Sequence, residues 1–543
     1  MRCIVSLIFA LFSFTSVVCA DPTPILPVRG CPIPSFKDIV LIGVGDSLTH
    51  GTMDATDNAT NTQHAYLQKV YESLAQVAEV SFSQPLFDYE ENRMLPLTIP
   101  TNLGVDGSDI YSLEGIEYYK RYDVDESFLT GKYLGDSLFP WWLHDLYDKV
   151  LYPINLLALK PVSQLDATVW LLNQVAEAGQ SKSVVIFWMG NNDSSNAALG
   201  LGTNNPLYIP LPLDQLEQEL NPLLFTLLRF WEQCGLISFE PYTISSIERN
   251  LTNAEDFAEQ YHRVLTRLAT EVPSLATHAE LFLCTLPYYS SVGYLLDSED
   301  MEYYLQKVNP AYTVPPSFKR VTEPGTPITD FSKGDRVSLF TFLTMYILLD
   351  QGNSVAQVNQ ILERDGEQQD GMVLSEDEQY YMRERIDSFN EAIKESIPTS
   401  STHVHLIDSG TYLNDALTGK ISIIINDKTL NRKWGRGNSF TLDGVHPGYT
   451  AHTLIANFII EHLNDTLTMN APLHELSEVM DTDPYVDKDG DGWVEGPAYT
   501  ASGITELLFL FKDPDDRDPT LQPTLPPDIW NYAIDILLRE FLF

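Results

Sequence analysis

Basic side chains are scarce in this sequence. Its 543 residues include 33 lysines and arginines against 75 aspartates and glutamates, a formal net charge of −42 at pH 7. Charge of this sign repels nucleic acid and anionic membrane surfaces at long range. The composition therefore argues against a nucleic-acid partner, and solubility is the simplest explanation of the acidity itself.

Cysteine is rarer still, with five residues in the whole chain, two of them within the first twenty. The remaining three, Cys31, Cys234 and Cys284, can form at most one bridge, which excludes a scaffold built on several disulfides. Cys284 lies in an apolar run, so we expect it to be a buried free thiol.

Long apolar runs are missing as well, because the apolar segment 337–349 is too short to span a bilayer. At the start of the chain, Arg2 is followed by the apolar residues 4–12 and then by Val18-Cys19-Ala20. This pattern predicts a signal peptide in residues 1–20, removed after Ala20, and hence a secreted protein, extracellular or periplasmic. A lipoprotein anchored at Cys19 is the alternative, although Val18 is bulky where a small residue is expected.

Hydrophobic residues make up 44% of the chain, which is enough for a sizeable core. They gather in short apolar runs bounded by turn residues, a pattern typical of strands buried on both faces of a parallel sheet. These runs are residues 39–44, 184–189, 281–286 and 404–407, with a weaker candidate at 79–82.

Helical patterns lie between these runs. Apolar residues recur at helical spacing in 65–74 and 454–463, and Ser375 with Glu378 forms a capping box at the start of another helix. Strands alternating with helices predict an α/β fold around a doubly wound parallel sheet, whose ligands bind at the carboxyl edge of the strands. Some connections are too long for simple crossovers, so we interpret them as insertions: 111–161, 194–248 and 287–375.

A serine follows the first apolar run. The run leads directly into Gly45-Asp46-Ser47-Leu48, which predicts that Ser47 lies on a tight turn at the carboxyl edge of the sheet, just before a helix. A serine there is exposed and lies close to helix-start amides that can stabilise an oxyanion. Ser47 could instead serve only as the cap of that helix.

An acid and a histidine stand together near the other end of the chain, where Asp443 precedes His446 by three residues. Pro447 keeps His446 out of helical geometry, so a short loop can present both side chains together. In a catalytic triad, the carboxylate fixes the imidazole tautomer and the imidazole takes the proton of the serine. The alternative is a capping aspartate beside a structural histidine.

Two segments rich in glycine and asparagine, residues 102–107 and 190–193, fit the same edge of the sheet, although such clusters are also ordinary turn chemistry. Together with the segments around Ser47 and His446, and in this order, they resemble the four sequence blocks of the SGNH hydrolase superfamily, also called the GDSL esterase/lipase family. The resemblance covers residues 36–463 without the long insertions. It implies a three-layer α/β/α sandwich with a five-stranded parallel sheet, as in flavodoxin-like folds.

The resemblance also implies roles for individual residues. Ser47 would be the nucleophile of a triad completed by Asp443 and His446. Donors from Ser47, Gly107 and Asn192 would form the oxyanion hole. Gly104 is an alternative to Gly107. The expected organisation is a signal peptide in 1–20, an SGNH hydrolase domain with long insertions in 36–466 and a C-terminal extension in 467–543.

The function that we expect is a secreted serine esterase or lipase that acts on lipid or fatty-acyl esters and needs no cofactor for catalysis. A carbohydrate acetylesterase and an acyltransferase are alternatives on the same scaffold. A calcium-stabilised binding or adhesion protein is the alternative of another class. The aromatic segment 138–143, which contains Trp141 and Trp142, could line an acyl pocket or form a core helix.

An acidic loop in the C-terminal extension has the spacing of the first half of a calcium loop. Ala498 stands at its twelfth position, where an EF-hand has a glutamate, so Asp481 or Asp483 would have to supply that ligand. A solvated acidic loop is the alternative to a structural calcium site. The expected ligands are Asp487, Asp489, Asp491 and Glu495.

Overall fold

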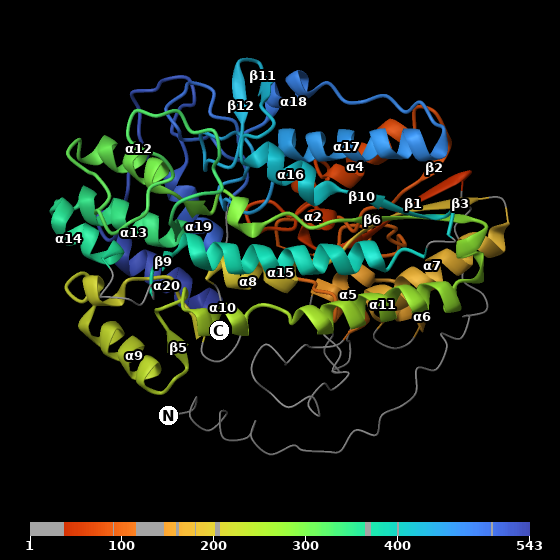
Figure 1. Cartoon of the computed structure of the whole chain (residues 1–543), viewed down its shortest axis with the longest axis horizontal. Helices are drawn as coiled ribbons and strands as arrows, with labels where there is room; N and C mark the ends of the chain where they lie inside the picture. The colour runs from red at the N-terminus through yellow and green to blue at the C-terminus, as the bar shows by residue number, and fades with distance from the viewer. Residues whose placement is uncertain are drawn as a thin grey trace.

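A five-stranded sheet lies at the centre of the computed structural model of the chain (Figure 1). All its strands are parallel, in the order β10-β6-β3-β1-β2. Each strand coincides with a predicted apolar run, which confirms the α/β class and the parallel sheet. The strands are β1 (Ile39–Gly45), β2 (Val80–Ser81), β3 (Lys182–Trp188), β6 (Ala279–Cys284) and β10 (Val404–Ile407).

Most but not all of the chain is described. The expected signal peptide, Cys31 and the Trp141-Trp142 segment lie outside the described residues. Within them, Cys234 is exposed and Cys284 is buried, both as free thiols, which confirms the expectation for Cys284. The structure describes residues 37–90, 92–115, 146–158, 162–179, 181–200, 207–363, 371–398, 401–500 and 503–542.

Strands β1 and β3 form the middle of the sheet and pair from Ile39 with Lys182 to Gly45 with Trp188. The strand order reverses between them, because β2 lies on one flank of β1 and β3 lies on the other. Ligands of such sheets bind at the carboxyl ends of the strands on either side of this reversal. Helices cover both faces (Figure 1), with α4 (Tyr66–Leu74) and α17 (Tyr449–Leu467) on one side and α7 (Gln164–Ala178), α11 (Ala254–Glu271) and α15 (Glu376–Glu395) on the other.

A second core lies beside the sheet and joins segments that are far apart in the sequence. Its central helix, α13 (Leu339–Asp350), is apolar on all sides, and every residue from Leu339 to Leu349 is buried. Phe511 from the C-terminal extension packs on Tyr346 of this helix, with ring centroids 5.8 Å apart. The apolar run 337–349 is therefore a strand end and a core helix. No helix of the described residues is long and apolar enough to cross a membrane.

Smaller elements complete these two cores. Around the second core lie α12 (Ser298–Val308), α19 (Ile504–Leu508), α20 (Ile529–Leu542), β7 (Leu295–Leu296), β8 (Arg336–Ser338) and β9 (Val373–Leu374). The other described helices are α2 (Ser47–His50), α3 (Ala59–Thr62), α5 (Leu146–Leu151), α6 (Ile154–Ala158), α8 (Asn192–Leu199), α9 (Pro222–Gln233), α10 (Ile244–Arg249), α14 (Val355–Asn359), α16 (Ser409–Leu417) and α18 (Leu476–Thr482). The other described strands are β4 (Leu207–Tyr208), β5 (Ile237–Ser238), β11 (Ile423–Ile425) and β12 (Lys428–Leu430).

Candidate active site

Ser47 is the first residue of α2, directly after the carboxyl end of β1. The cap of this helix is Asp46, whose Oδ1 accepts a hydrogen bond from the backbone N–H of Leu48 at 3.1 Å. The interpretation of Ser47 as a mere helix cap is therefore wrong, because the preceding aspartate already has that role. Ser47 is 7% exposed and lines a pocket.

His446 and Asp443 lie together on the loop before α17. The imidazole Nδ1 lies 2.6 Å from Asp443 Oδ2. The other carboxylate oxygen, Oδ1, accepts hydrogen bonds from Thr441 Oγ1 at 2.8 Å, from the Val445 N–H at 2.8 Å and from the His446 N–H at 2.9 Å. Asp443 is thus held rigidly and leaves His446 Nε2 as the ring nitrogen that is available to another group.

The electrostatics of this pair favour a charged imidazole. Burial by itself lowers the pKa of His446, but the neighbouring Asp443 carboxylate outweighs burial and raises that pKa to about 9. Burial has the opposite effect on Asp443 and raises its pKa, but His446 and the backbone N–H groups outweigh burial and hold this pKa below its ordinary value. The arrangement stabilises the imidazolium that forms when a histidine accepts a proton from a nucleophile.

The turn that follows α2 supports the acid, and sequence reasoning missed it. The Ala55 N–H donates to Asp443 Oδ2 at 2.9 Å. Asp54 is fully buried, and its Oδ1 accepts the Leu442 N–H at 2.8 Å while Tyr485 OH donates to its Oδ2 at 2.5 Å. Both Asp54 and Ala55 have positive φ, 53° and 50°. No sequence pattern marks these residues, because their partners lie almost four hundred positions later.

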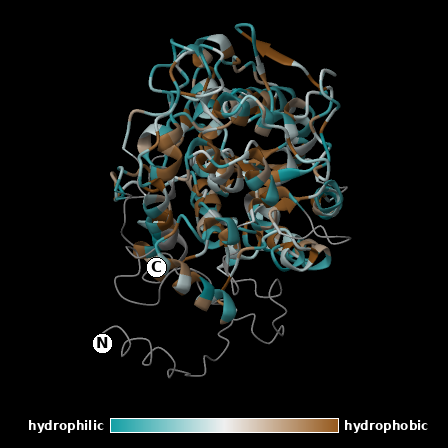
Figure 2. Ribbon diagram, turned by 90° about the vertical axis from the view of Figure 1, so that its left-hand side faces the viewer, coloured by the Kyte–Doolittle hydropathy of each residue, from teal (hydrophilic) through white to brown (hydrophobic). Residues whose placement is uncertain are grey.

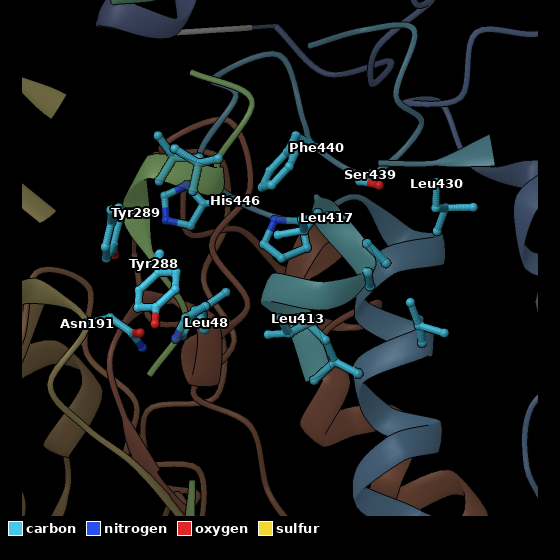
Figure 3. A pocket seen from close by; sticks show the side chains of 18 of the residues that line it. Leu48, Asn191, Tyr288, Tyr289, Leu413, Leu417, Leu430, Ser439, Phe440 and His446 are labelled. Carbon is cyan, nitrogen blue, oxygen red and sulfur yellow. The ribbon is translucent and has the colours of Figure 1, made fainter. Parts of the chain in front are cut away.

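Ser47 and His446 line the same pocket. Both residues belong to the described part of the chain, and no hydrogen bond joins them there, as is common for catalytic groups before a substrate binds. Figure 3 shows His446, Asn191, Tyr288 and Tyr289 on one side of the pocket and leucines of α16 on the other. Apolar side chains supply most of the wall, among them Leu48, Pro287, Val292, Leu413, Ala416, Leu417, Ile423, Leu430, Phe440, Val445, Leu454 and Ile455.

The two glycines proposed for the oxyanion hole differ in their surroundings. The Gly104 N–H donates to Asn102 Oδ1 at 3.0 Å, and a Cβ at Gly104 would lie 2.4 Å from the His50 nitrogen. Gly107 has φ +73°, and a Cβ added there would meet nothing within 4 Å. The amide of Gly104 is therefore used within its own loop. The Gly107 N–H also bonds to the Asp106 carboxylate, but Gly107 borders open space.

Asn192 begins α8, and its Nδ2 donates to the carbonyl oxygen of Ser108 at 3.0 Å. An amide group carries two hydrogens, so one remains for a ligand. The side chain that lines the pocket is that of Asn191, which donates from Nδ2 to Asp46 Oδ2 at 2.9 Å. The structure thus brings Ser47, His446 and Asp443 together. The bond from Asn192 to Ser108 also sets Asn192 beside Gly107, the residue before Ser108. Asn191 lines the pocket and was not among the predicted residues.

A further carboxylate, Asp106, acts on the candidate triad. Its negative charge contributes to the raised pKa of His446, and burial raises the pKa of Asp106 itself to about 6. Sequence reasoning noted this residue only as part of a glycine-containing segment. Asp106 acts on His446 because the 102–107 segment packs against β1. There the Leu103 N–H donates to the Gly43 carbonyl at 2.8 Å.

No described residue of the acidic loop lines this pocket. Asp487, Asp489 and Asp491 come close enough to share a metal ion, and Asp513 and Asp516 join Asp489 in a second such group. Glu495, predicted as a ligand, is instead 62% exposed in its side chain and pairs with Lys488 at 3.6 Å. The other two candidates are also used elsewhere, because Asp483 accepts the Thr450 N–H in the first turn of α17 and Asp481 accepts from Asn426.

The comparisons with known proteins bring no further evidence on this site. The chain matches no family model, no curated protein and no solved structure.

Proposed function

We propose that the chain is a secreted serine hydrolase of the SGNH type that cleaves carboxylic esters with fatty-acyl groups. One observation carries the proposal: Ser47, at the carboxyl end of β1, shares an apolar pocket with His446, which Asp443 orients. A nucleophile, a base and an acid from opposite ends of the chain meet at the edge of the sheet where ligands of such folds bind. Export is proposed from residues 1–20 alone.

The chemistry follows from these positions. His446 Nε2 accepts the hydroxyl proton as Ser47 Oγ attacks the ester carbonyl carbon, which gives a tetrahedral oxyanion. Backbone N–H groups of Ser47 and Gly107 and the free amide hydrogen of Asn192 would stabilise that charge. The carbon–oxygen bond to the alcohol then breaks, and the alcohol leaves with the proton from His446. Water repeats the sequence on the acyl-enzyme and releases the acid.

The walls of the pocket favour long acyl chains over acetyl groups. Leu413 and Leu417 of α16 and Leu430 of β12 stand across the pocket from His446 (Figure 3). An acyl chain along this wall would gain about 0.8 kcal/mol for each methylene that it buries. A carbohydrate acetylesterase would need polar side chains to bind sugar hydroxyls, and this wall has few of them.

The hairpin β11–β12 supports a lipid substrate. Ile423 and Leu430 from this hairpin line the pocket, while Ile424 is 63% exposed and Ile421 is 42% exposed. In Figure 2, strand β11 of this hairpin appears as a hydrophobic arrow at the top of the molecule. Exposed apolar residues at a pocket mouth are suited to contact with an aggregated lipid substrate.

The test is covalent labelling with a fluorophosphonate probe together with hydrolysis of nitrophenyl esters from acetate to palmitate. Ser47→Ala should abolish both labelling and hydrolysis and leave the melting temperature nearly unchanged, because one hydroxyl contributes little to the core. The matched control is Ser439→Ala, since Ser439 lines the same pocket and its hydroxyl donates to the Gly437 carbonyl.

Three outcomes separate the proposals. Labelling and hydrolysis that vanish in Ser47→Ala and persist in Ser439→Ala support the serine hydrolase. Substantial hydrolysis by purified Ser47→Ala would exclude Ser47 as the nucleophile. A wild-type protein that is neither labelled nor active on any ester would favour a binding protein on this scaffold.

A further inference from the structure

Five aspartates converge where the loop before Trp493 meets the segment before α20. The ligand atoms of Asp487, Asp489 and Asp491 lie within 4.8 Å of one another, and so do those of Asp489, Asp513 and Asp516. Four of the five are almost fully buried, with exposures of 5% for Asp487 and 4% for Asp491, Asp513 and Asp516. They are therefore not the solvated acidic loop that the sequence allowed as an alternative.

Three of these carboxylates have one oxygen in use and one without a hydrogen-bond partner. Their Oδ1 atoms accept backbone N–H groups, at 3.0 Å for Asp489, 2.9 Å for Asp513 and 2.8 Å for Asp516. Their Oδ2 atoms are buried and have no hydrogen-bond partner among the described residues. A buried carboxylate oxygen without a partner is costly, so each such oxygen requires a missing partner such as an ion.

The nearby lysines do not supply that partner. Lys307 and Lys428 donate to the backbone carbonyls of Asp491 and Asp487, not to their carboxylates. Lys488 lies within ion-pair distance of Asp516, 3.8 Å from Oδ2, but it is too far away to donate a hydrogen bond to that oxygen. Five carboxylates against these three lysines leave an excess of negative charge in the cluster.

We propose that Asp489, Asp513 and Asp516, with Asp487 and Asp491, form a structural Ca²⁺ site. The donors are all oxygen atoms, which is the ligand type that Ca²⁺ requires, and they come from two loops that can adapt to its larger coordination number. Asp513 and Asp516 would take the place of the glutamate that this loop lacks. The site goes beyond the proposed esterase function, because it takes no part in ester chemistry.

The ion would join the second core to the pocket wall. Trp493 follows the loop, is buried and packs on Tyr304 and Trp434, with ring centroids 4.8 Å and 5.8 Å away. The Asp487 N–H donates to Asn438 Oδ1 at 3.0 Å, and the next residue, Ser439, lines the pocket. Metal binding is therefore expected to stabilise the fold as a whole and to hold this side of the pocket in place.

The experiment uses the full secreted chain, stripped with EDTA and then titrated with Ca²⁺ in the absence of any ester. Two measurements are made: the melting temperature, and the luminescence of Tb³⁺ excited through Trp493, whose backbone N–H donates to Asp491 Oδ1 at 2.8 Å. The variants are Asp513→Asn and Asp516→Asn. The matched control is Glu495→Gln, which removes the carboxylate that the linear motif, but not the structure, assigns to the site.

Wild type and Glu495→Gln should melt a few degrees higher with Ca²⁺ and should sensitise Tb³⁺, because a ligand that binds only the native state stabilises it. Asp513→Asn and Asp516→Asn should lose both effects. Without metal they should melt no lower than the stripped wild type, since each removes one of several repelling charges, and this confirms that they fold. Mg²⁺ should act more weakly, because it demands a tighter octahedral site.

Two results would overturn the site. One is a wild-type protein that shows neither a Ca²⁺-dependent melting shift nor Tb³⁺ luminescence above that of Asp513→Asn. The other is that Glu495→Gln loses both effects while Asp513→Asn and Asp516→Asn keep them. In that case Glu495, as the linear motif predicts, would be the ligand. Neither measurement depends on Ser47, so failure here leaves the esterase proposal untouched.

Discussion

Asp443→Asn tests the triad at the residue whose surroundings are best defined. Oδ1 of Asp443 accepts three donors, and Oδ2 accepts two, the Ala55 N–H and His446 Nδ1. An asparagine would keep its oxygen where three donors converge, so its NH₂ group would replace Oδ2. That group donates a proton to His446 Nδ1, and the ring must then carry its own proton on Nε2. The nitrogen that should receive the serine proton is thereby blocked.

The size of the effect follows from this tautomer. The same substitution in an established serine protease triad lowers turnover about 10⁴-fold, and we expect a loss of that order, or about 5 kcal/mol of transition-state stabilisation. The fold should suffer much less. The Ala55 N–H loses its acceptor, which costs about 1 to 3 kcal/mol of unfolding free energy, and His446 loses the carboxylate charge that raises its pKa.

The assay is the pH dependence of kcat/KM on a nitrophenyl ester, measured beside the melting temperature. Thr441→Val is the matched control, because it removes one donor to Asp443 but leaves the carboxylate on His446, and it should lose less than about tenfold. A loss below tenfold in Asp443→Asn, with an unchanged pH profile, would refute the assignment of Asp443 as the acid of the triad.

Four further outcomes follow from the site. In wild type, kcat/KM should rise with pH through a midpoint above the ordinary histidine value of 6.5, because the base must be neutral and Asp443 raises the pKa of His446; a midpoint at or below 6.5 would contradict this. Asn192→Ala should keep probe labelling but lower turnover on the order of a hundredfold by loss of one oxyanion donor. Leu417→Ala should penalise palmitate esters more than acetate, and equal losses along the series would place the acyl chain elsewhere. Ile424→Glu should slow hydrolysis of vesicle or emulsion substrates while a soluble short ester is cleaved at the wild-type rate.

Local signals in the sequence predicted most of the sheet and the start of one helix. The apolar runs located all five strands, because strands buried on both faces must be apolar at every position. Ser375 and Glu378 predicted the start of α15, where both halves of the capping box are present. The run 79–82 predicted a longer strand than the two residues of β2. This strand lies at the edge of the sheet and pairs on only one side.

The candidate site could be predicted only in part. Ser47, Asp443 and His446 were found because each stands in a short pattern that the resemblance orders along the chain. Asn191 was passed over in favour of its neighbour, because sequence alone does not say which of two adjacent amides faces a cavity.

Residue types and local spacing determined, without any structure, that the chain is acidic and α/β, with a serine after the first strand and an acid–histidine pair near the end. Only the tertiary structure decided which residues surround the acid of this pair, Asp54 and Ala55 behind Asp443. It also decided that Asp513 and Asp516 lie beside Asp489 in the acidic cluster. The physical reason is that propensity and hydrophobic period act over a few residues. The partners of a buried carboxylate, in contrast, are set by how distant segments pack, and a linear motif such as that ending in Glu495 cannot report them.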